Sequence, residues 1–119
     1  MKLPGPDHPI TIEANPNRVR VIFNGKVVAD TRRALRLKEA AYPAVQYIPR
    51  EDADPSAFEP TPHRTHCPYK GDASYFTLKA GGRTAENAAW SYETPFPAVA
   101  AIAGHLAFYP NRVDRIEQG

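Results

Sequence analysis

The sequence predicts a mainly β protein, a single antiparallel domain with one short helix, and three observations support this class. Apolar and polar residues alternate with a two-residue period over much of the chain, the spacing of strands with one buried face. The pair Asn24-Gly25 lies between two such runs and is typical of a tight hairpin turn. Six of the thirteen prolines fall between Pro43 and Pro68, which excludes helix there. We therefore expect about eight short strands in a barrel-like antiparallel arrangement.

The first half of the chain predicts a meander of strands. Val19, Val21 and Phe23 share one face, and the chain returns after the turn at Asn24-Gly25. Further on, Leu35 and Leu37 alternate with Arg36 and Lys38; a helix capped by Thr31 is the alternative for this segment. The expected strands cover residues 10–13, 18–23, 26–29, 34–39 and 45–48.

The second half combines strands with a helix. Residues 51–59 are acidic and contain proline, which predicts an exposed loop. Strands are expected at 73–79 and 88–93, with a turn at Gly81-Gly82. The spacing of Val99, Ile102, Ala103 and Leu106 predicts one short helix that begins near Pro97 and ends at Gly104. Residues 106–109 and 113–117 are expected to close the domain as a hairpin around Pro110-Asn111.

Length and composition indicate one globular domain over residues 1–119. The chain is 42% hydrophobic and 24% charged, which excludes the disordered class. No apolar run is long enough to span a bilayer, and no secretory segment opens the sequence. A lone cysteine cannot form an internal disulfide. We therefore expect a cytoplasmic, bacterial-type protein without membrane contact.

The net charge of +2 conceals a gradient along the chain. Residues 1–40 carry eight Lys and Arg against four Asp and Glu. A basic face would form if the strands that carry Arg18, Arg20, Arg32, Arg33, Arg36 and Lys38 were neighbours, and a partner-binding protein is one alternative function. No aromatic residues interleave with these charges, so nucleic-acid binding is disfavoured.

The residues with chemical potential gather in the stretch from His63 to Tyr75. Cys67 is a candidate nucleophile if His63, His66 or His105 serves as its base. Zinc would accept these residue types, but adjacent His66 and Cys67 point to opposite sides of an extended chain. We therefore expect no metal and no cofactor.

Four polar-tipped aromatic residues flank this stretch: Tyr69, Tyr75, Trp90 and Tyr92. In an antiparallel pair of strands, Tyr75 would lie across from Trp90 or Tyr92. Buried hydroxyl and indole groups need hydrogen-bond partners, and a concave pocket with a few polar groups would supply them.

Three segments carry a family resemblance: Thr65-His66-Cys67-Pro68-Tyr69-Lys70-Gly71 with Ala73 and Tyr75, Ala89 to Pro95, and Leu106 to Tyr109 with Arg112 to Asp114. Over nearly its whole length the chain resembles the domain of unknown function family 427. That resemblance implies a tent-like, mostly β fold without an agreed activity. A nucleotidyltransferase name is attached to the family, but the Gly-Ser turn and two metal-binding aspartates of such enzymes are absent here. The family motif also implies that one site contains Cys67, Tyr69, Lys70, Tyr75, Trp90, Tyr92 and Glu93.

The leading hypothesis is a pocket between the sheets for a small anionic or aromatic molecule. Tyr69, Tyr75, Trp90 and Tyr92 would wall it, and Lys70 and Arg64 would meet negative charge. Candidate catalytic residues, for the alternative of an enzyme, are Cys67, Lys70, Glu93 and His105. Exposed strand edges leave a homodimer open.

Overall fold

Ten strands make up most of the computed structural model, which describes residues 1–119. The first five are β1 (Ile10–Asn15), β2 (Val19–Phe23), β3 (Lys26–Thr31), β4 (Ala34–Glu39) and β5 (Val45–Tyr47). The other five are β6 (Phe58–Cys67), β7 (Gly71–Ala80), β8 (Arg83–Ser91), β9 (Ala107–Phe108) and β10 (Arg115–Gln118). All pairings between them are antiparallel, so the predicted fold class is confirmed.

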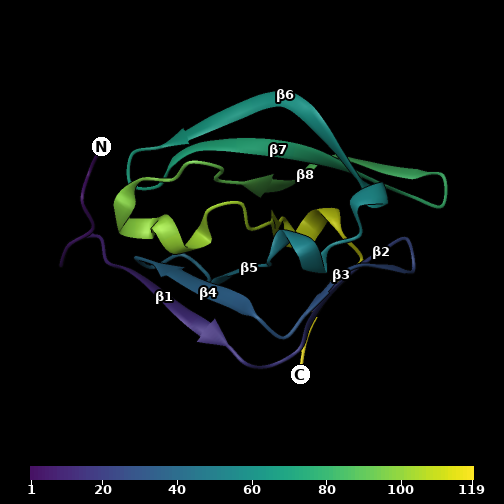
Figure 1. The fold of residues 1–119 in the computed structure, drawn as a ribbon, viewed down its shortest axis with the longest axis horizontal. Helices are drawn as coiled ribbons and strands as arrows, with labels where there is room; N and C mark the ends of the chain where they lie inside the picture. The colour runs from purple at the N-terminus through teal and green to yellow at the C-terminus, as the bar shows by residue number, and fades with distance from the viewer.

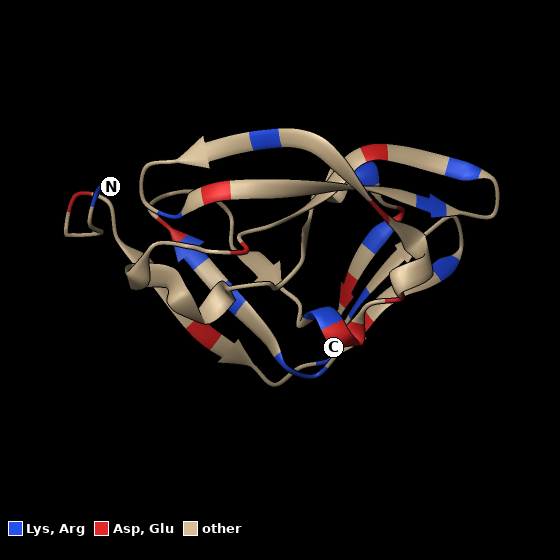
Figure 2. Cartoon of the chain, turned by 45° about the horizontal axis from the view of Figure 1, so that its top comes forward, with Lys and Arg blue, Asp and Glu red and all other residues tan.

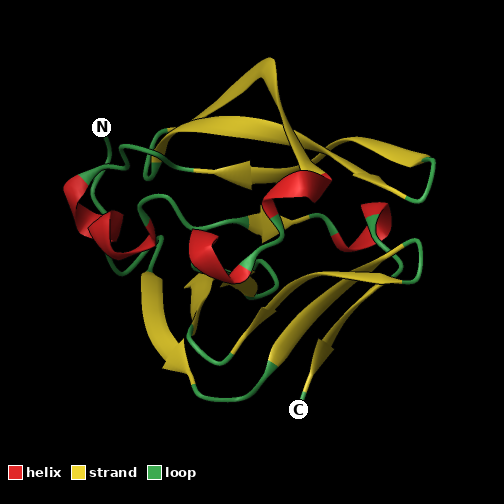
Figure 3. Cartoon of the chain, turned by 45° about the vertical axis from the view of Figure 1, so that its right-hand side comes forward, coloured by secondary structure: helices red, strands yellow, loops and turns green.

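The strands form three sheets arranged like a roof over two walls. A four-stranded sheet in the order β6-β7-β8-β9 lies across the top in Figure 1, above the sheets β1-β4-β5 and β10-β2-β3. Four 3-10 segments, η1 (Arg50–Asp52), η2 (Pro55–Ala57), η3 (Pro97–Ile102) and η4 (Pro110–Arg112), occupy the level between roof and walls (Figure 3). The space between the four-stranded sheet and the β1-β4-β5 sheet is where the site described below lies.

The hairpin between β2 and β3 forms as the sequence predicts. Asn24 and Gly25 both adopt positive φ angles, 51° and 75°, which a tight hairpin turn requires and which these two residue types tolerate best. Val19, Val21 and Phe23 are completely buried on the inner face of β2. The hairpin therefore places three apolar side chains of β2 in the core.

Strand β6 begins at the end of the predicted loop of residues 51–59 and continues to Cys67, where the sequence predicted no strand. This ten-residue strand pairs only with β7, so it is an edge strand. Pro60 and Pro62 fit there because an edge strand leaves one side of its backbone without ladder hydrogen bonds. The register shifts between Thr61 and Arg64, where the strand bends. The stretch is therefore the end of β6, a turn and the start of β7.

The predicted closing hairpin is wrong. Strand β9 pairs with β8, and β10 pairs with β2, more than ninety residues earlier in the chain. Local spacing cannot reveal such a long-range pairing, and η4 carries the chain from one sheet to the other.

The predicted helix begins at Pro97 as expected but is 3-10 in form. Val99 and Ile102 are both completely buried, and a spacing of three suits a helix with three residues per turn. Val99 has φ −123°, which breaks the segment into two short turns. None of the helical segments is long and apolar enough to cross a membrane.

The core has two parts. The larger is mostly aliphatic and packs β2 and β3 beneath β7 and β8, with Val21, Phe23 and Leu78 among its fully buried members. The smaller lies between the β1-β4-β5 sheet and the four-stranded sheet and contains Leu37, Tyr47, Tyr75 and Tyr92. Tyrosine is therefore concentrated in the second part.

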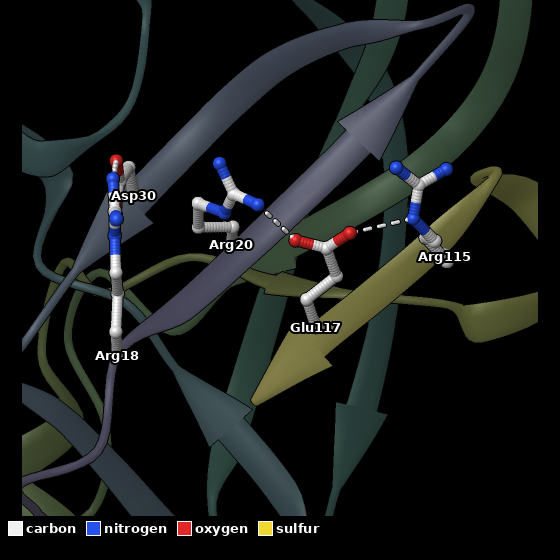
Figure 4. A network of polar contacts seen from close by, with 5 residues as sticks. All are labelled: Arg18, Arg20, Asp30, Arg115 and Glu117. Carbon is white, nitrogen blue, oxygen red and sulfur yellow. Dashed lines mark hydrogen bonds and ion pairs between the residues drawn. The ribbon is translucent and has the colours of Figure 1, made fainter. Parts of the chain in front are cut away.

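The arginines of the first third do not form one basic face. Arg18 makes a two-pronged contact with Asp30 (2.9 and 2.7 Å), and Glu117 accepts from both Arg20 and Arg115 (Figure 4). Arg36 belongs to another sheet. Acidic and basic positions are interspersed along the strands in Figure 2, and several of the basic ones form ion pairs.

Acid should destabilise the fold by protonating carboxylates that form ion pairs, and Asp54, which pairs with Lys26, is one of them. A hydrogen bond from Lys26 and two from Ser56 lower the pKa of Asp54 from 3.8 to about 2. The stability that Asp54 contributes is present above pH 3.8 and is lost as the pH falls toward about 2, since the unfolded chain then binds the proton more readily. Urea unfolding at a series of pH values should show this fall, and Asp54→Asn should flatten it. An identical pH dependence in the variant would contradict the assignment.

Candidate functional site

A cavity of about 230 Å³ opens between the β1-β4-β5 sheet and the four-stranded sheet. We call it the aromatic cavity, because six of its eleven lining residues have aromatic rings. Its lining comes from both sheets and from the loops at their ends: Leu37, Glu39, Tyr42, Pro43, Val45, Tyr47, Lys70, Tyr75, Trp90, Tyr92 and Tyr109. Elements far apart in the sequence therefore build one site.

A buried ion pair provides the cavity's charged groups. The ammonium of Lys70 donates to Oε1 of Glu39, and both side chains are about nine-tenths buried. The other carboxylate oxygen, Oε2, lies 2.7 Å from Nε2 of His8. Burial raises the pKa of Glu39, but the hydrogen bonds from Lys70 and His8 outweigh it and leave the pKa below its ordinary value. Glu39 is therefore ionised at neutral pH and compensates the charge of Lys70.

The turn between β6 and β7 positions Lys70. Gly71 follows it with φ 111°, a left-handed conformation that side chains rarely adopt, so the turn favours glycine at this point. The carbonyl of Lys70 accepts from the backbone N–H of Phe96 at 2.9 Å. With its backbone held, Lys70 reaches Glu39 across the gap between the sheets and places Nζ 5.8 Å from the centre of the Tyr92 ring.

The aromatic wall spans β7, β8 and the segments that follow β8 and β9. Tyr75 pairs directly with Trp90, which confirms the predicted cross-strand neighbours. The indole Nε1 of Trp90 donates to the Tyr47 hydroxyl at 3.3 Å, and the Trp90 ring lies 4.6 Å from that of Tyr109. The hydroxyls of Tyr75 and Tyr109 are 3.1 Å apart. These contacts hold four rings around one hollow.

The hydroxyl of Tyr92 makes no hydrogen bond within the protein, unlike those of Tyr47, Tyr75 and Tyr109. The residue is only 6% exposed and lines the cavity. Burial raises the pKa of Tyr92 and of Tyr47, so both hydroxyls stay neutral. Burial and the Tyr75 hydroxyl likewise raise the pKa of Tyr109 to about 12. The cavity thus offers neutral hydroxyl groups, and that of the buried Tyr92 has no partner in the protein.

Lys70, Tyr75, Trp90 and Tyr92 are the predicted site residues that the structure brings together. Of the Cys-Pro-Tyr-Lys-Gly motif, only Lys70 lines the aromatic cavity. Tyr69 lies just outside, where its ring stacks on His8 at 3.9 Å. Tyr69 therefore packs against His8, the residue that contacts Glu39, and does not form part of the cavity wall.

Glu93 and His105 lie in a different hollow, of about 410 Å³, beside Arg33 and Arg50. Arg50 donates to Glu93 at 2.6 Å, and Nδ1 of His105 lies 3.1 Å from the carbonyl of Ala103. These two residues therefore share no surface with Lys70.

Arg64 and Cys67 are also outside the aromatic cavity. Arg64 is exposed and donates to the carbonyls of Thr61 and His63. Cys67 is half-buried against the smaller core, and its sulfur makes no hydrogen bond. The neighbouring His66 contacts Asp72 at 2.7 Å instead. No base is arranged to activate the Cys67 thiol, and no group of three or more possible metal ligands forms in the structure.

Sequence reasoning missed Glu39, Tyr47, Tyr42 and Tyr109 as site residues. Glu39 carried a usable signal, because it continues the inward series of Leu35 and Leu37 at two-residue spacing. A carboxylate on the apolar face of a strand needs a compensating partner. Tyr47 alternates with Val45 in the same way. Tyr109 carried no such signal, since its place depends on the pairing of β9 with β8.

A family model described as "Domain of unknown function (DUF427)" matches residues 11–119. The match spans every strand except the first residue of β1 and includes all lining residues of the aromatic cavity. No curated protein matches the chain.

Breaking the buried ion pair should cost more stability than breaking an exposed one. Lys70→Met or Glu39→Gln alone should each lower the free energy of unfolding by about 3 kcal/mol, because each leaves a buried partner uncompensated. The double variant should lose less than the sum, giving a coupling energy of about 2 kcal/mol. Urea unfolding measures all three variants.

The control is the exposed pair of Lys79 and Glu59, whose side chains are about half exposed. Their coupling energy should stay below about 1 kcal/mol. Equal coupling energies for the buried pair and the exposed pair would contradict the importance of burial at Lys70 and Glu39.

Proposed function

The chain belongs to the DUF427 family, and because that description assigns no activity, we propose from the site itself that the protein binds a small molecule with an aromatic ring in the aromatic cavity. The observation that carries the proposal is a hollow enclosed by five tyrosines and a tryptophan. Ring faces and edges favour stacked and edge-on contacts with another ring. A mostly apolar hollow with a few placed polar groups is the usual form of a ligand site.

The charge balance narrows the ligand class. An anionic ligand was one expectation from the sequence, because Lys70 would attract it. Glu39 already neutralises Lys70 inside the cavity, so little free positive charge is left for an anion. Inserting a lone negative charge beside Glu39 would also add repulsion. Of the two ligand classes expected from the sequence, anionic and aromatic, we therefore retain the aromatic one.

The polar groups of the aromatic cavity would then orient the bound ring. The Tyr92 hydroxyl has an unused donor and acceptor in an almost fully buried place. A ligand group that bonds to this hydroxyl would gain a hydrogen bond inside the cavity. A ring with one hydrogen-bonding substituent, such as a phenol or an indole, has the matching chemistry.

A cytoplasmic, bacterial-type setting remains our inference from the single cysteine, which cannot form an internal disulfide. A ligand from the metabolite pool of the cell would suit that setting.

Trp90 makes the proposal directly testable, because it is the only tryptophan and it lines the cavity. Titration with phenol should change the Trp90 emission saturably and raise the melting temperature, since a ligand that binds only the folded state stabilises it. Val45→Phe should abolish both effects by filling the cavity with a ring of its own.

The matched control is Val27→Phe, at an exposed position outside the aromatic cavity, which should leave phenol binding unchanged. Folded protein whose Trp90 emission and melting temperature ignore phenol would refute the proposal.

A further inference from the structure

A second cavity adjoins the first and shares two residues with it. This polar cavity has a volume of about 460 Å³ and is lined by His63, Tyr75, Glu86, Asn87, Tyr109, Asn111 and Arg112. Tyr75 and Tyr109 line both hollows, so the two rings and their 3.1 Å hydroxyl contact form the boundary between them. Of the residues singled out for chemistry in the sequence, the polar cavity contains only His63 and Tyr75.

Two opposite charges in the polar cavity are free of ion pairs. Arg112 donates through Nη1 to the backbone carbonyl of Glu86 at 2.8 Å, which holds its guanidinium at the rim. The remaining N–H groups of Arg112 have no acceptor in the protein, and the carboxylate of Glu86 has no donor. The site therefore offers one anchored cation and one anion that line the same cavity but form no ion pair with each other.

The backbone at Asn87 is built to shape this cavity. Asn87 has φ 50°, and the ladder between β7 and β8 shifts register next to it, which marks a bulge. Its Oδ1 accepts from the Thr61 hydroxyl at 2.7 Å, and its amide N–H groups are left free. Asn111 adds a second amide from η4. Donors and acceptors thus surround the two charges.

We propose that the polar cavity binds the charged head of an aromatic α-amino acid whose ring enters the aromatic cavity. The inference rests on the proposed function, since it assumes a ring beside Trp90. Arg112 would hold the carboxylate, for which a guanidinium has matching paired donors. Glu86 would hold the ammonium. Such a ligand carries no net charge, in agreement with the balanced charges of both cavities.

Tyr109 controls the passage between the two hollows. Its side chain is 38% exposed, and its hydroxyl is tied only to Tyr75. Its backbone N–H is fixed to the carbonyl of Ala88 at 3.0 Å, so the ring can turn outward while the chain stays in place. In the proposed complex this ring leaves its contact with Trp90 and rotates outward, so that the ring of the ligand can enter the aromatic cavity.

The test compares four probes by calorimetry and Trp90 emission: L-phenylalanine, 3-phenylpropionate, phenethylamine and phenol. The second lacks the ammonium and the third lacks the carboxylate. L-Phenylalanine should bind about tenfold or more tightly than either, because each missing group forfeits one charge-assisted contact. Equal affinities across the three charged probes would overturn the inference.

Charge-removing variants separate the two contacts. Arg112→Gln should weaken L-phenylalanine and 3-phenylpropionate by about tenfold and leave phenethylamine unchanged. Glu86→Gln should weaken L-phenylalanine and phenethylamine and leave 3-phenylpropionate unchanged. Arg36→Gln and Glu13→Gln are matched controls, because both positions are exposed on the β1-β4 pair and line neither cavity.

The outcomes distinguish this inference from the function on which it rests. If phenol binds beside Trp90 but the two variants at Arg112 and Glu86 behave like their controls, the charged-head assignment is wrong and the aromatic site stands. If neither phenol nor L-phenylalanine binds the folded protein, both proposals fail. The selective losses described above would establish the polar cavity as the second half of the site.

Discussion

The contact between Lys70 and Glu39 is the constraint on which the site depends. It joins the end of β4 to the turn between β6 and β7, and so ties one wall of the domain to its roof. Two charges that are about nine-tenths buried persist only where each compensates the other and further hydrogen bonds support them. His8 gives that support to Glu39, while the Tyr92 ring lies near Lys70. The pair therefore fixes both the spacing of the sheets and the electrical neutrality of the cavity between them.

The two parts of the core differ in composition: the larger part is densely packed and apolar, and the smaller part contains the aromatic cavity. Beneath β7 and β8, Val21, Phe23 and Leu78 are fully buried among other apolar side chains. This packing stabilises the fold and contains no polar side chain that needs a hydrogen-bond partner. The smaller part accepts tyrosine hydroxyls, an ion pair and a hollow, all of which are less favourable than dense aliphatic packing. A domain of this size can carry such a region because the larger part supplies the burial that folding needs.

Local patterns predicted much of the fold, and long-range pairing explains what they missed. The Asn24-Gly25 hairpin, the bounds of β4 and the start of η3 at Pro97 all follow from the chemistry of a few adjacent residues. The length of β6 did not follow, because its prolines are tolerated only once it is known to be an edge strand. The partner of β10 could not be derived from neighbouring residues at all, since it pairs with β2 from the other end of the chain.

The same physical distinction governs the site. Tyr75, Trp90 and Tyr92 could be placed together because adjacent antiparallel strands fix their neighbours, and Tyr75 does face Trp90. Glu93 follows Tyr92 in sequence, yet the alternation of side chains along an extended segment sends it to Arg50 in another hollow. Tyr109 joins the cavity only because two residues of β9 complete the four-stranded sheet. Its ring then lines both the aromatic cavity and the polar cavity, so the shortest strand of the domain places a residue of the boundary between them.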